Sequence, residues 1–238
     1  MLKITNLSKT YENGKKAVDD VSLTIESGEI FAFIGHNGAG KTTTIKCAVG
    51  LLEFEKGEIL IDNMSIKENP IACKQITAYI PDNPDIYQSL TGIQFLNFIA
   101  DIYKIPKDIR NKDIARYANL YEITKNLGDL ISSYSHGMKQ KLILISALIR
   151  HPKLLILDEP FVGLDPKASH ATKELMKEMC ENEGASVFFS THVLEVAEKL
   201  CDKVAIIKNG KIVAMGPMDE IRGDKTLEDV FLELETNA

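Results

Sequence analysis

The sequence lacks any apolar run long enough to cross a membrane. Its longest strongly apolar stretch is 142–149, which is bounded by Lys141 and Arg150, whereas a membrane-spanning helix needs roughly 20 such residues. The first residues alternate between apolar and polar as a strand does, so we expect no signal peptide. If the protein works at a membrane, we therefore expect another chain to span it.

The sequence also lacks an excess of positive charge and any closely spaced pair of cysteines. Its 28 Lys and Arg residues face 34 Asp and Glu residues, and this net charge of −6 does not favour nucleic acid as a partner. The four cysteines have neither disulfide-framework nor metal-ligand spacing, which favours reduced, packing cysteines in a cytosolic protein. They are Cys47, Cys73, Cys180 and Cys201.

What the sequence does contain is a phosphate-binding loop. Residues 35–42 fit G-x-x-x-x-G-K-[ST], with an apolar run at 30–34 before them and a helix-compatible stretch at 43–49 after them. Glycines let successive N–H groups point into one concavity, which the positive end of the helix reinforces. Lys41 can then reach the β- and γ-phosphates, and the Thr42 hydroxyl can bind Mg²⁺. The predicted nucleotide-binding residues are Gly35, His36, Asn37, Gly38, Ala39, Gly40, Lys41, Thr42 and Thr43.

Two carboxylates follow the apolar strand predicted at 154–157. The carboxyl ends of strands are where α/β sheets usually hold their ligands. Asp158 offers a hard oxygen to Mg²⁺, and Glu159 is placed to accept a proton from a water that attacks the γ-phosphate. His192, after the strand predicted at 186–190, is placed to touch the γ-phosphate or that water. A lone histidine is more often a surface or packing residue, so this alternative stays open.

The order of the predicted elements indicates an α/β fold with a mainly parallel sheet. The first sixty residues read mostly as strands, and helices follow at 91–103, 108–120 and 135–150. Strands at 154–157, 186–190 and 204–207 then alternate with helices at 166–180 and 192–200, and a hairpin turn follows at 209–210.

The motifs and their order resemble those of the nucleotide-binding subunits of ABC transporters over nearly the whole chain. Walker A corresponds to 35–43, Walker B to 154–159, the D-loop with Asp165 to 163–165, and the switch histidine to His192. The resemblance implies a P-loop NTPase core with an antiparallel β subdomain (1–82 and 151–238) and an inserted helical subdomain (83–150). It also implies that Tyr11 stacks on adenine, with Val18 as an apolar neighbour. Otherwise Tyr11 is a strand aromatic in the core.

The family's signature, usually Leu-Ser-Gly-Gly-Gln, corresponds to 134–138. Ser135 and Gly137 match, whereas His136 and Met138 depart from it. Ser135 opens a predicted helix, so its hydroxyl and the helix N-terminus form an anion site. In the family this site faces the γ-phosphate on another protomer, which implies a homodimer, or a dimer with a paralogous ABC subunit, around two ATP molecules. The alternative is a simple capped helix.

Asp82 stands where the family usually has the glutamine of the Q-loop. It keeps an oxygen ligand but adds a negative charge and shortens the reach. We expect Asp82 to approach the Mg²⁺ ion, directly or through water, because the cation offsets its repulsion from the γ-phosphate. The alternative is a turn residue within Pro-Asp-Asn-Pro.

The resemblance implies an ATPase that binds ATP and Mg²⁺, with Lys41, Glu159 and His192 as catalytic residues and Thr42, Asp158 and Asp82 as metal-binding residues. We expect it on the cytoplasmic face of the cell membrane, where it energises transport through a separate permease contacted by 83–150, with 82–90 at the base. The segment 226–234, the signature and Asp82 resemble exporters of the ABC-2 type, including drug-resistance systems. An importer is the alternative.

Two other functions fit the sequence less well. Soluble ABC ATPases that act on the ribosome or on nucleic acid usually carry two nucleotide-binding domains or a long coiled coil. This chain has one predicted domain, no heptads and no basic patch. A generic P-loop kinase would leave the signature region unexplained.

Overall fold

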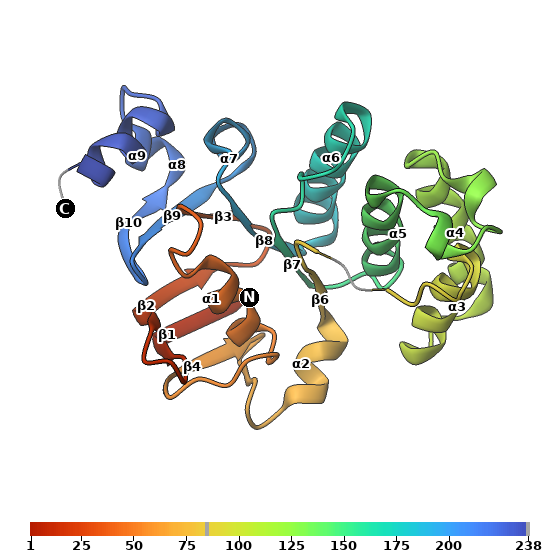
Figure 1. The fold of residues 1–238 in the computed structure, drawn as a ribbon, viewed down its shortest axis with the longest axis horizontal. Helices are drawn as coiled ribbons and strands as arrows, with labels where there is room; N and C mark the ends of the chain where they lie inside the picture. Colours follow the sequence, from red (N-terminus) through yellow and green to blue (C-terminus); the bar gives the residue numbers. More distant parts are fainter. Residues whose placement is uncertain (84–85, 237–238) are drawn as a thin grey trace.

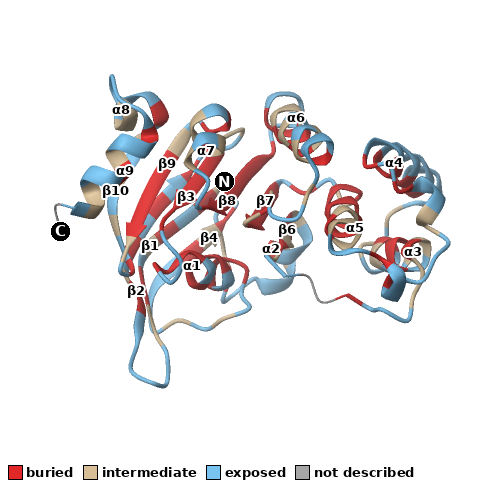
Figure 2. Ribbon diagram, turned by 45° about the horizontal axis from the view of Figure 1, so that its top comes forward, coloured by how far each residue is buried: buried red, intermediate tan, exposed pale blue. Residues whose placement is uncertain are grey.

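The computed structural model describes residues 1–83 and 86–236, which form two β-sheets flanked by helices (Figure 1). Among these residues, six strands form a sheet in the order β10-β9-β3-β8-β7-β6. Only the β10–β9 pair is antiparallel. The strands are β3 (Ile30–Ile34), β6 (Thr77–Ile80), β7 (Leu154–Asp158), β8 (Ser186–Thr191), β9 (Lys203–Lys208) and β10 (Lys211–Pro217). Every residue of β3, β7 and β8 is buried, as expected for parallel strands that are covered on both faces (Figure 2).

The second sheet is antiparallel and comes from the first part of the chain. Its order is β2-β1-β4-β5, with β1 at Leu2–Thr10, β2 at Lys16–Ile25, β4 at Lys56–Ile61 and β5 at Met64–Ser65. Alternate residues such as Leu2, Ile4 and Leu23 are buried in one cluster with Phe31 of β3 and Ile45 of the first helix. The predicted α/β fold with an antiparallel N-terminal part is therefore confirmed.

Local signals explain where the main helices begin. Thr91 and Gln94 form a reciprocal capping box at α3, and the side chains of Ser135 and Asp165 cap α5 and α6. The helices are α1 (Lys41–Ala48), α2 (Pro70–Ile76), α3 (Gly92–Ile102), α4 (Lys107–Leu120), α5 (His136–Leu148), α6 (Pro166–Glu183), α7 (Leu194–Leu200), α8 (Met218–Arg222) and α9 (Leu227–Thr236). Short 3₁₀ turns occupy Thr124–Asn126 and Ile131–Ser133.

The helices α3, α4 and α5 lie together at one end of the molecule, at the right of Figure 1. Helix α5 is largely buried and packs against both α3 and strand β6, so it joins this group to the central sheet. The predicted subdomain boundaries at 83–150 remain a prediction. Residues 84–85, within the segment 82–90 predicted to contact a permease, lie outside the described residues.

The ends of several elements differ from those predicted. Helix α7 begins at Leu194 and not at His192, because Thr191 is still in β8 and Val193 has an extended backbone.

All four cysteines are buried and free. Within the part of the chain that the structure describes, no helix combines the length and the apolar character that a membrane span requires.

Candidate nucleotide-binding site

The phosphate loop connects β3 to α1 at the carboxyl edge of the central sheet. Gly40 ends the loop with a φ of 116°, and a Cβ atom there would lie 2.5 Å from the Ala17 carbonyl oxygen. Both the backbone conformation and the lack of space therefore require glycine. The N-terminus of α1 points its free N–H groups toward the loop, as an anion site needs.

Lys41 is buried, and its ammonium group is held by the chain itself. Nζ donates hydrogen bonds to the carbonyl oxygens of Gly35 and His36, the latter at 3.3 Å. It also lies 3.5 Å from Oε1 of Glu159, whose Oε2 is 3.0 Å from Nδ1 of His192. The structure thus brings the three predicted catalytic residues, from three separate segments, into one chain of contacts.

The two carboxylates after β7 are fixed by a residue of the next strand that the sequence analysis did not single out. Ser190 Oγ donates to Asp158 Oδ1 at 2.5 Å and accepts from the Glu159 N–H at 3.1 Å. Glu159 has a φ of 50°, and its Oε1 is buried without a hydrogen-bond partner. The only sequence signal for Ser190 is its place at the carboxyl end of a buried strand.

A pocket of about 370 Å³ lies over the phosphate loop. It is lined by Tyr11, Lys15, Ala17, His36, Asn37, Gly38, Gly40, Lys41, Thr42, Thr43, Asp82 and Glu159. Asp82 therefore faces the same space as the loop. The Tyr11 hydroxyl lies 3.1 Å from Thr43 Oγ1, and its side chain borders the pocket. Val18 is fully buried, and Ala17 lines the pocket in its place, so a role for Val18 beside adenine stays a prediction.

The oxygen atoms around this pocket fit a magnesium ion. Thr42 and Asp82 line the pocket, and Asp158, which is 2% exposed, directly precedes Glu159 of the same lining. Among the residues that the structure describes, no three His, Cys, Asp or Glu side chains form a metal cluster. Mg²⁺ usually takes one or two carboxylates and completes its shell with water and substrate phosphates.

The signature residues lie apart from this pocket. Ser135 Oγ accepts from the Met138 N–H at 3.3 Å, and the Met138 side chain packs against the core. The exposed His136 ring instead adjoins the D-loop. A Cβ on Gly163, whose φ is +80°, would lie 2.6 Å from this ring. In this chain the end of α5 therefore contacts the D-loop, and none of its described residues 135–138 lines the pocket.

An ion pair strengthens the link between α5 and the D-loop. Lys141 Nζ lies 2.6 Å from Asp165, and this hydrogen-bonded lysine holds the pKa of the Asp165 carboxyl below its usual range. The Asp165 side chain also accepts from the Ala168 N–H at 2.8 Å and so caps α6. Nothing in the sequence around Lys141 indicates this contact, because its partner lies 24 residues away.

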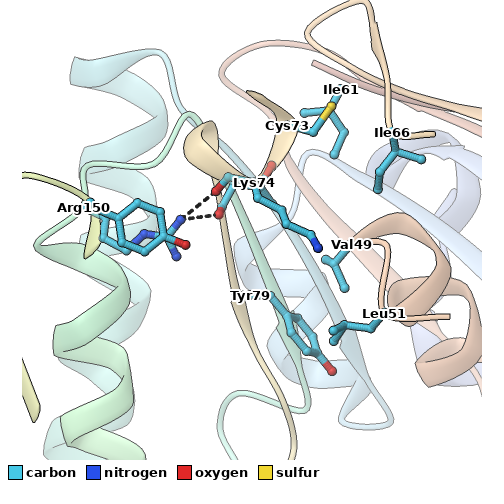
Figure 3. A pocket seen from close by; sticks show the side chains of 10 residues that line it. Val49, Leu51, Ile61, Ile66, Cys73, Lys74, Tyr79 and Arg150 are labelled. Carbon is cyan, nitrogen blue, oxygen red and sulfur yellow. Dashed lines mark hydrogen bonds between the residues drawn. The ribbon is translucent and has the colours of Figure 1, made fainter. Parts of the chain in front are cut away.

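A second cavity, of about 290 Å³, opens between β6, the end of α1 and the helical group (Figure 3). Its lining is mostly apolar: Val49, Leu51, Ile61, Ile66, Cys73, Lys74, Thr77, Tyr79, Tyr103 and Arg150. Two neighbouring cavities share Tyr103 and Arg150 with it, and we call the three together the groove. Arg150 lies 3.6 Å from the Tyr103 ring centre and donates to the carbonyl oxygens of Lys74 and Thr77, at 2.9 and 2.6 Å.

The comparisons with known proteins agree with this geometry. The family profile described as "ABC transporter" matches residues 18–162, and a profile described as "AAA domain, putative AbiEii toxin, Type IV TA system" matches residues 130–198. The chain is 36% identical to the ABC-type transporter ATP-binding protein EcsA of Bacillus subtilis, over 98% of this chain and 96% of that protein. It is 34% identical to the bacitracin transport ATP-binding protein BcrA of Bacillus licheniformis, over 93% of this chain and 71% of that protein.

Solved structures lead to the same family. A structure titled "Structure of ATP binding subunit of ABC transporter" superimposes with a TM-score of 0.94 and 35% identity, covering 99% of both chains. The ATP-binding cassette MJ0796, solved as a dimer bound to ADP and Pi, shares the fold with a TM-score of 0.83 and 23% identity, over 92% of this chain and 99% of that chain. The chain belongs to the ATP-binding subunits of ABC transporters, and it is an ATPase.

Proposed function

We propose that this subunit energises export of a substrate through a separate membrane-spanning subunit. The observation that carries the proposal is that the nucleotide pocket and the groove share one short segment, β6 and the residues that directly follow it. Tyr79 of β6 lines the groove, and Asp82, two residues past the end of β6, lines the pocket. A partner in the groove and a nucleotide in the pocket would therefore act on the same short segment.

The groove supports docking of an apolar segment from the membrane subunit. Leu51, Ile71 and Ile102 line it and are 61%, 73% and 56% exposed, and apolar side chains gathered on one exposed surface mark an interaction site. Among the described residues that line the groove, the charged ones are the cations Lys74, Lys104 and Arg150. Such a surface suits an apolar segment that carries a carboxylate or free helix carbonyl groups.

The chain's own residues support water attack on the γ-phosphate. Lys41 has its ammonium near the Glu159 carboxylate, so an incoming phosphate competes for Lys41 and frees Glu159 to accept a proton from water. His192, at 3.0 Å from Glu159, orients that base and can donate toward the γ-phosphate. Thr42, Asp158 and Asp82 would hold Mg²⁺, which neutralises phosphate charge when it is bound.

The signature helix supports a homodimer, or a dimer with a paralogous ABC subunit, that closes on two ATP molecules. The N-terminus of α5 lies apart from the phosphate pocket of its own chain, so its free N–H groups are available to the nucleotide of another chain. The proposal is supported by MJ0796, a cassette of the same fold that was solved as a dimer in a post-hydrolysis state bound to ADP and Pi. Closure would place Ser135 against the γ-phosphate of the ATP that the other protomer binds.

Export, as opposed to import, rests on the relatives. BcrA is named for bacitracin transport, and another relative, LnrL of Bacillus subtilis, is named for linearmycin resistance. The test replaces the native subunit with Glu159→Gln in its own cells and compares growth against a panel of membrane-active antibiotics. We expect the variant to sensitise the cells to at least one compound.

The matched control for that experiment is Glu195→Gln. Glu195 is an exposed carboxylate that pairs only with Lys199 on α7 among its described neighbours, so this change should leave resistance intact. Unchanged resistance together with impaired uptake of a nutrient would contradict export and favour the importer.

A further inference from the structure

The C-terminal helix α9 reaches the phosphate loop from the far end of the chain. Leu227 and Phe231 on its inner face are buried and anchor it in the core. The Phe231 ring meets the His36 ring edge-to-face, with 4.9 Å between the ring centres. One turn later, the Glu235 carboxylate lies 3.6 Å from Nε2 of His36. Two side chains of α9 thus contact the second residue of the loop.

The end of α9 is fixed by the same hairpin that supports the loop. Lys208, the last residue of β9, donates to the carbonyl oxygens of Leu234 and Glu235 at 3.2 and 2.8 Å. A cation at this position can donate hydrogen bonds to the last carbonyl groups of the helix, and it is attracted by the negative end of the helix dipole. Two residues on, the Gly210 N–H donates to the Ala39 carbonyl oxygen in the loop at 2.8 Å.

His36 connects α9 to the lysine of the site. Its carbonyl oxygen accepts from the Ala39 N–H at 3.1 Å and from Lys41 Nζ at 3.3 Å. Its side chain is 65% exposed, so the loop's own fold leaves the ring largely in solvent. The contacts with α9 therefore limit the freedom of the residue whose carbonyl oxygen shapes the turn around Lys41.

We propose that α9 is a clamp on the phosphate loop, in which Phe231 and Glu235 are positioning residues that act on ATP binding through His36. A loop that is already ordered loses less conformational freedom when the nucleotide binds. The proton-accepting Glu159 and His192 follow other strands, β7 and β8, so the clamp acts on ATP affinity more than on the chemical step. This role is independent of the direction of transport.

The test is MgATP binding and steady-state hydrolysis by the full-length subunit carrying Phe231→Ala. An edge-to-face aromatic contact of ordinary strength predicts a rise of about three- to tenfold in Kd and KM for ATP. We expect kcat to stay within about twofold. Phe231→Tyr keeps the ring and should restore affinity. Leu232→Ala, on the exposed side of the same helix, is the matched control and should leave Kd unchanged.

A double-mutant cycle with His36→Ala separates positioning from general packing. If α9 acts through His36, the double variant binds ATP no more weakly than the weaker single variant. Additive losses, or an unchanged Kd in well-folded Phe231→Ala, would overturn the proposal. If Phe231→Ala fails to fold, the exposed His36→Ala alone decides, because the clamp predicts the same loss of affinity and an unchanged Kd would refute it.

Discussion

The nucleotide pocket and the groove are only a few residues apart along β6, yet they are built from different chemistry. The pocket is lined by backbone groups and by charges of both signs, from Lys15 and Lys41 to Asp82 and Glu159. The described lining of the groove is mostly apolar, and its ionic groups are all cations. A phosphate needs directed N–H groups and one lysine, whereas a protein segment needs exposed apolar area. Because of this contrast, we expect a substitution in the pocket to impair ATP hydrolysis alone and a substitution in the groove to impair the proposed docking alone.

The largest effect should come from removing Glu159, the proposed base in the pocket. Glu159→Gln leaves no carboxylate to accept the proton of the attacking water, so we expect the ATPase rate to fall by about 10²–10⁴-fold. ATP should stay bound, and capture of the membrane subunit should be retained. Single-turnover hydrolysis and nucleotide binding measure the two effects, and Glu195→Gln is the control. A fully active Glu159→Gln subunit would refute the assignment.

The next effect should come from the groove. Leu51→Lys places a charge where we propose that an apolar segment docks, and burying that charge is costly, so we expect capture of the membrane subunit to fall at least about tenfold. The ATPase rate of the free subunit should change by no more than about twofold. Val213→Lys places the same charge on β10, at another exposed apolar side chain, and should not affect capture. Equal losses in both variants would argue against the groove.

A smaller effect is expected at Asp82, where the two regions meet. Asp82→Ala removes one hard oxygen from the proposed metal site, so we expect the Mg²⁺ concentration for half-maximal ATPase activity to rise about tenfold. Asp82→Glu restores a carboxylate and should recover much of the Mg²⁺ dependence. An unchanged Mg²⁺ dependence and rate in Asp82→Ala would leave Asp82 as a turn residue only.

The smallest effect concerns two buried thiols, one near the nucleotide pocket and one in the groove. Burial raises the pKa of Cys47, behind the phosphate loop, to about 11, and it also raises the pKa of Cys73, in the groove. Folding therefore favours the neutral thiols. This contribution to the free energy of unfolding is fully present below pH about 8.5, the ordinary pKa of a thiol, and it is lost as the pH rises from there through the raised pKa values of the folded state. At pH 8, iodoacetamide should label both thiols only after unfolding, as measured by mass spectrometry. Rapid labelling of native Cys47 would contradict the packing.

The parts of the site that the sequence predicts are those encoded by local patterns. The phosphate loop, Asp158, Glu159 and His192 follow apolar strands, and parallel strands bring their carboxyl ends to one edge. Helix α2 was missed although Pro70 at its first position is a start signal. The Ser190 bridge, the pairing of Lys141 with Asp165, and the groove depend on packing between distant segments, which no local pattern specifies.

The signature and the C-terminal segment show the same limit. The sequence indicates that Ser135 caps α5. It does not indicate that His136 of α5 adjoins Gly163, or that the N-terminus of α5 lies apart from the nucleotide pocket. The segment 226–234 carries a family resemblance without any hint that α9 touches His36. Its position follows from the packing of Phe231 and from Lys208, neither of which has a sequence signal.

The most direct test of the account is capture of partners from detergent-solubilised native membranes with the Glu159→Gln subunit and MgATP. We expect this variant to hold ATP with little hydrolysis and so to keep the proposed closed state. We predict a stoichiometric multispanning membrane protein, and its loss when Leu51→Lys is added. Recovery of ribosomes, nucleic acid or no partner would contradict the transporter account and favour a soluble ATP-driven switch.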